Sequence, residues 1–242
     1  MTRPSPTTPL AAPALCRRSM STPIGPLELV AGPAGLRAVL WPGEDGSRVA
    51  RAVGPAGPRA GDGPGEAGGE GTEVASGVSG GAAPEVASAV SGGAAREVAS
   101  AVSEGAVPEV VGAGARWDPA DLLRAEEHLD AAQTQLEEYF SGSRREFDLA
   151  LDPVGTEFQR RAWMALRTIP YGRTISYGEQ AAEMGEPGAA RAVGAANGRN
   201  PLSIVVPCHR VVAASGALTG FAGGLGTKAW LLDHERAVLA GG

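Results

Sequence analysis

The chain has 242 residues, 43% of them hydrophobic, which is enough for one or two globular domains, and its formal net charge is −6. Its 2 cysteines, Cys16 and Cys208, are too few for a disulfide framework and favour a reducing, cytoplasmic location. Every apolar run is shorter than the roughly 20 residues of a membrane span, and the N-terminus lacks the hydrophobic core of a signal peptide.

Charge is divided unevenly along the chain. Residues 153–242 hold 9 basic and 6 acidic side chains, a net charge of +3, whereas residues 1–152 hold 12 and 21, a net charge of −9. A mildly basic C-terminal part can approach phosphates, but an asymmetry of this size is also common in proteins that never bind nucleic acid.

The first 41 residues predict a tail and a hairpin. We expect residues 1–19 to be a disordered tail, because they lack apolar periodicity. From residue 20 to 41, Leu27 and Leu29 alternate with polar neighbours, and Leu36 and the run ending at Trp41 follow a Pro33-Ala34-Gly35 turn. This pattern predicts a β-hairpin.

Residues 42–116 are of low complexity. They contain no aromatic residue and hold 18 of the 36 glycines, and Glu-Val-Ala-Ser recurs every twelve residues from Glu73. A regular repeat can indicate a solenoid, but these units have too few large apolar residues to bury a core. We therefore predict a disordered insert and keep the solenoid as the alternative.

Regular structure is expected to resume after Trp117. Asp118 is a favourable N-cap and Pro119 suits the first helical position, and apolar residues recur at helical spacing as far as Phe140. Phe147, Leu149 and Leu151 then alternate, as in an edge strand or an extended linker. Hairpin, helix and strand together predict a small α+β domain over residues 20–152, interrupted by the insert.

Residues 153–242 are predicted to be mainly helical. One helix runs from Phe158 to Ile169 and ends at Pro170-Tyr171-Gly172, and Ser176 with Glu179 forms a capping box for the next. A break at residues 185–188 separates it from a short helix of small residues, 189–197. This pair fits a helix-turn-helix, although generic helical bundles contain such pairs too. The second helix lacks long polar side chains, so contact through shape and phosphates is more plausible than base reading.

Cys208 is followed directly by His209, and Glu235 lies 26 residues beyond that histidine. A cysteine, a base and an orienting carboxylate are the parts of an activated nucleophile. Taken singly, each has an ordinary explanation, such as a buried core thiol, a packed imidazole or a solvated acid. Neighbours on a strand point to opposite faces, so pairing Cys208 with His209 requires a turn or a bridging water.

The segment from Phe158 to Val238 resembles the O6-alkylguanine-DNA alkyltransferases, also called methylated-DNA–protein-cysteine methyltransferases. Letters and spacing agree in Thr174-Ile175-Ser176-Tyr177-Gly178, Ala190-Arg191-Ala192-Val193-Gly194, Asn200-Pro201, Pro207-Cys208-His209-Arg210, Gly223-Gly224-Leu225, Lys228 and Trp230-Leu231-Leu232-Asp233-His234-Glu235. Thr22-Pro23-Ile24-Gly25 is similar to the start of the family's ribonuclease-H-like domain, whereas the insert has no counterpart. The resemblance implies an α+β protein: a small ribonuclease-H-like N-terminal domain (20–152) and a mainly helical C-terminal domain (153–242) with a helix-turn-helix.

The resemblance implies direct reversal of DNA alkylation damage without a cofactor. Cys208 would accept the alkyl group from O6 of guanine in duplex DNA, with O4 of thymine as an alternative donor. His209 would act through a water as the base for the thiol, and Glu235 would hold and polarise its imidazole. No adjacent group can hydrolyse the resulting thioether, so the protein, expected to be a monomer, is consumed in one turnover.

The resemblance also implies how the damaged nucleotide is held. Tyr177 would crowd the phosphate beside it, Arg191 would fill the gap in the base stack, and Asn200 would fasten the DNA-binding element to the active-site loop. The remaining residues that it implies are Ala190, Ala192 and Gly194 against the DNA, and Val211, Phe221, Ala222, Gly223 and Lys228 in the pocket.

Two departures from the family pattern affect these expectations. Where the family commonly has a tyrosine ahead of the paired glycines, this chain has Phe221 followed by Ala222, so a hydroxyl donor to the purine is missing. The cysteine and histidine cluster of the family's structural zinc site is also missing, since only Cys16 lies in that region, and we predict no metal.

Two other classes of function remain open. A cysteine hydrolase using Cys208, His209 and Glu235 would turn over repeatedly and would leave Arg191 and Tyr177 without a role. A non-catalytic DNA-binding relative that flips lesions would be expected to lack the nucleophile.

Overall fold

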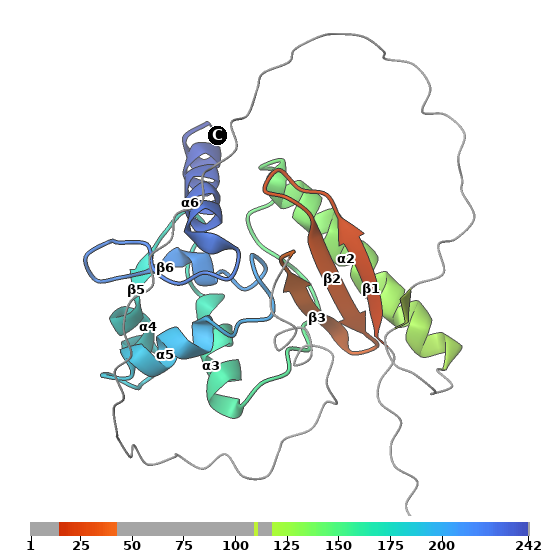
Figure 1. Cartoon of the computed structure of the whole chain (residues 1–242), viewed down its shortest axis with the longest axis horizontal. Helices are drawn as coiled ribbons and strands as arrows, with labels where there is room; N and C mark the ends of the chain where they lie inside the picture. Colours follow the sequence, from red (N-terminus) through yellow and green to blue (C-terminus); the bar gives the residue numbers. More distant parts are fainter. Residues whose placement is uncertain (1–14, 43–108, 111–117, 242) are drawn as a thin grey trace, which may run out of the picture. The chain divides into compact units, whose positions relative to one another are not determined.

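The computed structural model describes residues 15–42, 109–110 and 118–241 (Figure 1). Apart from Pro42, Glu109 and Val110, the predicted insert 42–116 lies outside the described residues, as does the predicted tail up to residue 14. Within the described part of the chain, no helix is both long and apolar enough to cross a membrane.

A four-stranded antiparallel sheet forms the N-terminal part. Its strands are β1 (Cys16–Met20), β2 (Leu27–Gly32), β3 (Gly35–Leu40) and β4 (Glu109–Val110), in the order β3-β2-β1-β4. The predicted hairpin is confirmed as β2 and β3. Gly35 has a φ of 146°, and a Cβ placed there would lie 2.5 Å from the carbonyl oxygen of Ala150, so this position requires glycine.

Two of the predicted boundaries are wrong. Cys16–Met20 forms a strand although residues 1–19 were expected to be a tail, and Glu109–Val110 pairs with it although the insert was expected to reach residue 116. Tertiary contacts explain the first error. Cys16 and Met20 are buried, and Arg18 pairs with Glu126 (2.6 Å) and Asp130 (2.5 Å), which are more than 100 residues away.

Helix α2 (Pro119–Phe140) packs against the sheet, as Figure 1 shows. Its predicted start is confirmed, because the side chain of Asp118 accepts a hydrogen bond from the backbone of Ala120 at 2.9 Å. The helix buries one stripe of side chains against β1 and β2: Ala125, Leu129, Ala132, Leu136 and Tyr139. Gly142, with a φ of 79°, allows the chain to turn away after the helix.

The segment after α2 is extended and meets the sheet at one point. Leu36 forms an isolated parallel bridge with Leu151, through hydrogen bonds between Leu36 N and Ala150 O (2.8 Å) and between Asp152 N and Leu36 O (2.9 Å). The buried Arg37 forms an ion pair with Asp152. Of the two predictions for this segment, the extended linker is closer than a full edge strand.

The C-terminal part is mainly helical, as predicted. Together with the N-terminal sheet, it makes the protein a mixed α and β structure. The C-terminal part contains α3 (Glu157–Leu166), β5 (Ile175–Ser176), α4 (Tyr177–Glu183), α5 (Ala190–Asn197), the 3₁₀ turn η1 (Cys208–Arg210), β6 (Val211–Val212) and α6 (Gly224–Gly241). The capping box of Ser176 and Glu179 is confirmed. Helix α3 ends at Leu166, earlier than predicted, and the parallel pairing of β5 with β6 was not predicted.

Candidate active site and DNA-binding surface

Cys208 begins the turn η1, at the end of a buried loop that follows α5. Cys208 N donates to Val206 O at 2.8 Å, and Arg210 N donates to Pro207 O at 3.0 Å. Because the three residues lie on a 3₁₀ turn and not on a strand, successive side chains are about 120° apart. Of the two arrangements that would allow Cys208 to pair with His209, a turn or a bridging water, the structure therefore has the turn.

Asn200 and Ile204 shape the loop that carries Cys208. The buried side-chain amide of Asn200 donates to Val206 O at 2.8 Å, and its oxygen accepts from Leu202 N at 3.0 Å. Ile204 is fully buried and has a φ of 72°, a conformation that is strained for a β-branched residue. Asn200 thus ties the end of the α5 region to the residues just before Cys208, whereas nothing in the sequence signalled the strain at Ile204.

His209 and Glu235 are fully buried and in contact. The Nε2 atom of His209 lies 2.8 Å from Oε1 of Glu235. Burial raises the pKa of Glu235, but the hydrogen bonds from His209 and Arg210 and the positive charge of Arg210 outweigh it and hold the pKa at about 2. An ionised carboxylate only accepts hydrogen bonds, so Nε2 carries the hydrogen. In the neutral imidazole, Nδ1 is then the basic nitrogen.

Glu235 accepts hydrogen bonds from three further residues, none of which the sequence analysis had identified as part of the site. They are the hydroxyl of Tyr139 (3.0 Å), the backbone N–H of Gly172 (2.8 Å), and the guanidinium of Arg210 through Nε (3.2 and 3.1 Å) and Nη2 (2.9 Å). Arg210 stood in the recognised motif, which was the one available signal. Tyr139 and Gly172 come from distant segments that only the fold brings to Glu235.

The surroundings keep His209 neutral. Burial is the main cause that lowers its pKa below the ordinary value of 6.5; Glu235 opposes this, while the positive charges of Arg210 and Lys228 add to it. Arg210 pairs with Glu235, so the carboxylate charge is shared and does not force His209 into the cationic form. A neutral buried imidazole is suited to accept a proton.

Lys228 is fully buried and interacts electrostatically with Cys208. Its ammonium group donates to Val211 O (2.6 Å) and Thr219 O (2.8 Å). Burial lowers the pKa of Lys228, and the charge of Cys208 partly opposes that effect. The ammonium therefore lies close enough to interact with a thiolate at Cys208 and also fixes the carbonyl of the predicted pocket residue Val211.

Phe221 lies beside His209, which supports its placement in the pocket wall. The two ring centroids are 6.4 Å apart in an edge-to-face arrangement. Ala222 is exposed, and Gly223 packs against Trp41, a residue that the sequence analysis placed only in the hairpin. The structure thus brings Phe221 and Gly223 to the site and leaves Ala222 pointing into solvent.

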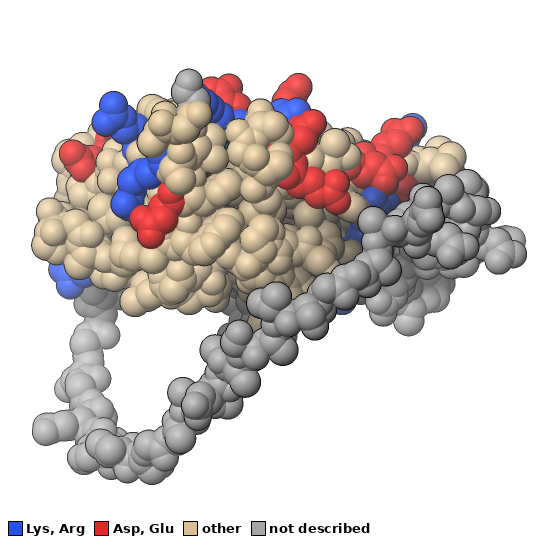
Figure 2. Space-filling view, turned by 90° about the horizontal axis from the view of Figure 1, so that it is seen from above, with Lys and Arg blue, Asp and Glu red and all other residues tan. Residues whose placement is uncertain are grey.

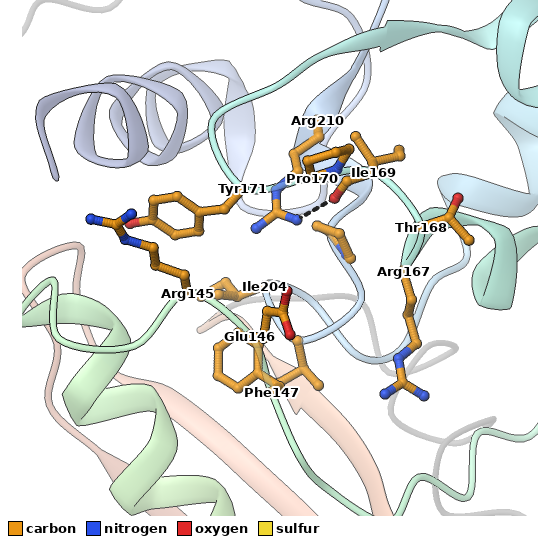
Figure 3. Close-up of a pocket in the computed structure, with 12 residues that line it drawn as sticks. Arg145, Glu146, Phe147, Arg167, Thr168, Ile169, Pro170, Tyr171, Ile204 and Arg210 are labelled. Carbon is orange, nitrogen blue, oxygen red and sulfur yellow. Dashed lines mark hydrogen bonds between the residues drawn. The ribbon is translucent and has the colours of Figure 1, made fainter. Parts of the chain in front are cut away.

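A separate cavity of about 290 Å³ reaches Arg210 but not Cys208 or His209. Figure 3 shows Arg210 in its wall, donating to the carbonyl of Ile169 at 2.7 Å. The Arg145 and Arg167 side chains reach different parts of the cavity, and the carboxylate of Glu146 lies between them (Figure 3). The cavity is therefore distinct from the place where Cys208 would meet a substrate.

Helices α4 and α5 form the predicted helix pair. Their crossing is held by a buried amide pair, in which Asn197 Nδ2 donates to Gln180 Oε1 at 2.7 Å. Tyr177 begins α4, its ring lies in contact distance of Gly194, and its hydroxyl accepts from Thr219 Oγ1 at 3.2 Å. Tyr177 thereby links the helix pair to the segment that Lys228 holds.

The outer face of α5 carries the predicted DNA-binding residues. Arg191 and Ala192 are exposed, and Ala190 and Gly194 are partly so, whereas Val193, Ala196 and Asn197 are buried. The exposed face therefore presents one arginine among small side chains. On the face shown in Figure 2, basic and acidic side chains are interspersed along one edge, so that face offers no patch of a single charge.

Comparisons with known proteins agree with this geometry. Residues 157–237 match the family model "6-O-methylguanine DNA methyltransferase, DNA binding domain". The methylated-DNA–protein-cysteine methyltransferase of Mycolicibacterium paratuberculosis is 64% identical over 105 residues, 43% of this chain and 64% of that protein. The protein of the same name from Methanosarcina acetivorans is 53% identical over 117 residues, 48% of this chain and 75% of that protein.

Solved structures extend the similarity to the N-terminal part. The crystal structure of Mycobacterium tuberculosis O6-methylguanine methyltransferase matches with a TM-score of 0.57 and 33% identity, covering 92% of this chain and 93% of that one. A second match of the same quality is the Mycobacterium tuberculosis OGT in complex with DNA. In the sequence comparisons, the matched region covers 64% of the length of the Mycolicibacterium paratuberculosis protein and 66% of that of the Mycobacterium bovis protein, so this chain spans less than two thirds of these relatives. The chain belongs to the methylated-DNA–protein-cysteine methyltransferase family.

Proposed function

We propose that this protein repairs alkylated duplex DNA by moving an alkyl group from O6 of guanine to the sulfur of its own Cys208. The observation that carries the proposal is that His209, the residue after Cys208, is buried and forms a hydrogen bond with Glu235 through Nε2. That pairing leaves Nδ1 of His209 as its basic nitrogen, and Nδ1 has no hydrogen-bond partner among the described residues. The family membership supplies the substrate class, with O4-alkylthymine as a secondary one.

The chemical step is a displacement at the alkyl carbon. The thiol proton of Cys208 passes through one water to Nδ1 of His209, leaving a thiolate, the nucleophilic form of cysteine. The sulfur forms a bond to the alkyl carbon as the bond between that carbon and O6 breaks, and the electron pair goes to the guanine. The guanine then takes up the proton from His209, so that unmodified guanine and a thioether at Cys208 result.

The surrounding charges favour this step. The ammonium of Lys228 interacts with the developing thiolate, while the carboxylate of Glu235 stabilises the imidazolium that forms on His209. Arg210 and Tyr139 hold that carboxylate in place through their hydrogen bonds. Because a thioether has no adjacent group able to cleave it, each molecule acts once.

A guanine inside a duplex must leave the base stack before Cys208 can reach it, at a cost of a few kcal/mol. We infer that Arg191, which is exposed on α5, enters the vacated position and offsets part of this cost. The small residues Ala190, Ala192 and Gly194 let α5 approach the DNA backbone closely. Tyr177 lies where α4, α5 and the pocket segment meet, which suits a contact with the neighbouring phosphate.

The assembly that acts is inferred to be a monomer working in the cytoplasm on chromosomal DNA. A stoichiometric reaction on one damaged nucleotide needs one copy of the site. We also infer that the sheet with α2 is the family's ribonuclease-H-like domain, which the likeness to the Mycobacterium tuberculosis structures supports.

Intact-protein mass spectrometry after incubation with an O6-methylguanine duplex tests the proposal. We expect a gain of one methyl group, mapped to Cys208, that saturates at one per protein and is absent in Cys208→Ser. Cys16→Ala is the matched control, because Cys16 is the second buried thiol and should not affect the gain. Repeated turnover of a substrate without a stable adduct would instead favour a cysteine hydrolase.

A further inference from the structure

Trp41 follows directly after β3 and is held by it next to the active-site loop. Two residues earlier, Val39 N donates to Pro201 O at 2.8 Å, and Val39 forms an isolated bridge with Leu202. These contacts tie the end of β3 to the loop that leads to Cys208. The indole of Trp41 is only 6% exposed and therefore has a fixed place at this junction.

The indole contacts the segment Phe221–Gly223 at both of its ends. Its ring centroid lies 5.7 Å from that of Phe221, with an interplanar angle of 65°, which is a favourable edge-to-face contact. At the other end, a Cβ added to Gly223 would lie 2.7 to 3.1 Å from three atoms of the indole. The backbone of Gly223 thus rests directly on the ring.

Phe221 in turn lies edge-to-face with His209 at 6.4 Å. Three rings, those of Trp41, Phe221 and His209, therefore connect the end of β3 to the proposed catalytic base. The segment is fixed before Phe221 by the bond from Lys228 to Thr219, and it closes with a turn in which Gly224 N donates to Phe221 O at 3.0 Å. Between these points, the indole is the surface on which the segment rests.

We propose that Trp41 is a specificity-determining residue that sets the width of the alkyl pocket by holding Phe221 and Gly223 against the site. This inference rests on the proposed alkyl transfer and deepens it. Trp41 acts through Phe221 and does not itself touch the transferred group. With the indole in place, the wall is rigid and suits a small alkyl group; without it, the wall can move outward.

The test compares transfer rates from two duplexes, one with O6-methylguanine and one with O6-benzylguanine. Trp41→Ala should slow methyl transfer, because the purine is held less firmly, and should favour the bulkier group. We expect the benzyl-to-methyl rate ratio to rise about tenfold, the discrimination that a methylene-sized change in an apolar pocket typically gives. Trp41→Phe should restore most of the wild-type ratio, since the indole N–H has no partner among the described residues.

A second pair of variants probes the same contact from the other side. Gly223→Ala places a methyl group against the indole and should reduce transfer of both groups by several-fold. In the Trp41→Ala background the same substitution should have little further effect, because the ring that it meets is gone. Equal losses from Gly223→Ala in both backgrounds would overturn the inference. If Trp41→Ala proves too unstable for rate measurements, Trp41→Leu serves as the second background, because leucine also removes the ring that the added methyl group would meet.

Trp230→Ala is the matched control. Trp230 is a partly buried tryptophan whose ring contacts are with His234 at 5.0 Å and Phe140 at 6.0 Å, and not with the segment Phe221–Gly223. Its loss should lower thermal stability without changing the benzyl-to-methyl ratio. If the wild type is alkylated at Cys208 and the benzyl-to-methyl rate ratio of Trp41→Ala stays within twofold of the wild-type ratio, this inference is wrong and the proposed function still holds. A wild-type protein that accepts neither group overturns the proposed function.

Discussion

Replacing Glu235 with glutamine should both destabilise the protein and nearly abolish alkyl transfer. The carboxylate accepts hydrogen bonds from His209, Tyr139, Gly172 and Arg210, and all of these partners are donors. The glutamine amide has only one oxygen, and its NH₂ group would face donors. It would also leave the buried guanidinium of Arg210 without a counter-charge. Removing one partner of a buried ion pair costs about 3–5 kcal/mol, and we expect a loss of this size at neutral pH.

The pH dependence of stability gives an independent measure of the same carboxylate. A pKa of about 2, against an ordinary value of 4.5, corresponds to about 3 kcal/mol of stabilisation. Because the pKa is lowered on folding, this stabilisation is fully present above pH 4.5 and is lost as the pH falls towards 2. Glu235→Gln should lack that component, so its free energy of unfolding should fall less steeply between pH 4.5 and 2 than that of the wild type.

Urea denaturation across this pH range, combined with single-turnover rates, measures both effects. Loss of the orienting carboxylate should slow alkyl transfer about 100-fold or more, in the range that general-base catalysis supplies. Glu183→Gln is the control, since Glu183 is exposed on α4 and should leave stability and rate unchanged. A Glu235→Gln protein within 1 kcal/mol of the wild type at pH 7 would refute the reasoning.

Three further predictions follow from the site. Phe221→Tyr should speed transfer from O6-methylguanine about 5- to 150-fold by supplying a hydroxyl donor worth about 1–3 kcal/mol, and an unchanged single-turnover rate would show that this donor is not missing. Arg191→Ala should slow transfer from duplex DNA about tenfold while leaving reaction with free O6-benzylguanine base unchanged, because the free base needs no flipping; equal slowing with both substrates contradicts the role. Burial lowers the pKa of His209 below 6.5, so the transfer rate should be constant around pH 7 and should decline only when the pH is lowered further. If the rate already falls as the pH is lowered from 8 to 7, His209 is not a neutral base at pH 7.

Much of the local structure could be predicted because its causes lie within a few residues. Asp118 with Pro119 marks the start of α2, and Ser176 with Glu179 forms the capping box of α4; both signals use backbone groups two or three residues away. The β2–β3 hairpin follows in the same way from alternation on each side of a two-residue turn.

The fold's less regular parts depend on partners that are remote in sequence. Strand β1 looks polar because of Arg17 and Arg18, and it becomes a strand only when α2 supplies Glu126 and Asp130 as partners. The short β4 likewise exists only as the neighbour of β1. Short segments of this kind lack a periodic signal of their own, so tertiary contacts decide their conformation.

In the candidate site too, some residues could be predicted from the sequence and others depend on the tertiary structure. Cys208, His209 and Glu235 could be named from the sequence because a nucleophile, its base and an orienting acid are recognisable by residue type and motif spacing. The tertiary structure decided the 3₁₀ turn that carries Cys208 and His209, the hydrogen-bond donors Tyr139 and Gly172 on Glu235, and the position of Trp41 against Phe221. These contacts join residues from about 60 to 180 positions apart, and such pairings arise from packing of the whole core, which no local pattern encodes.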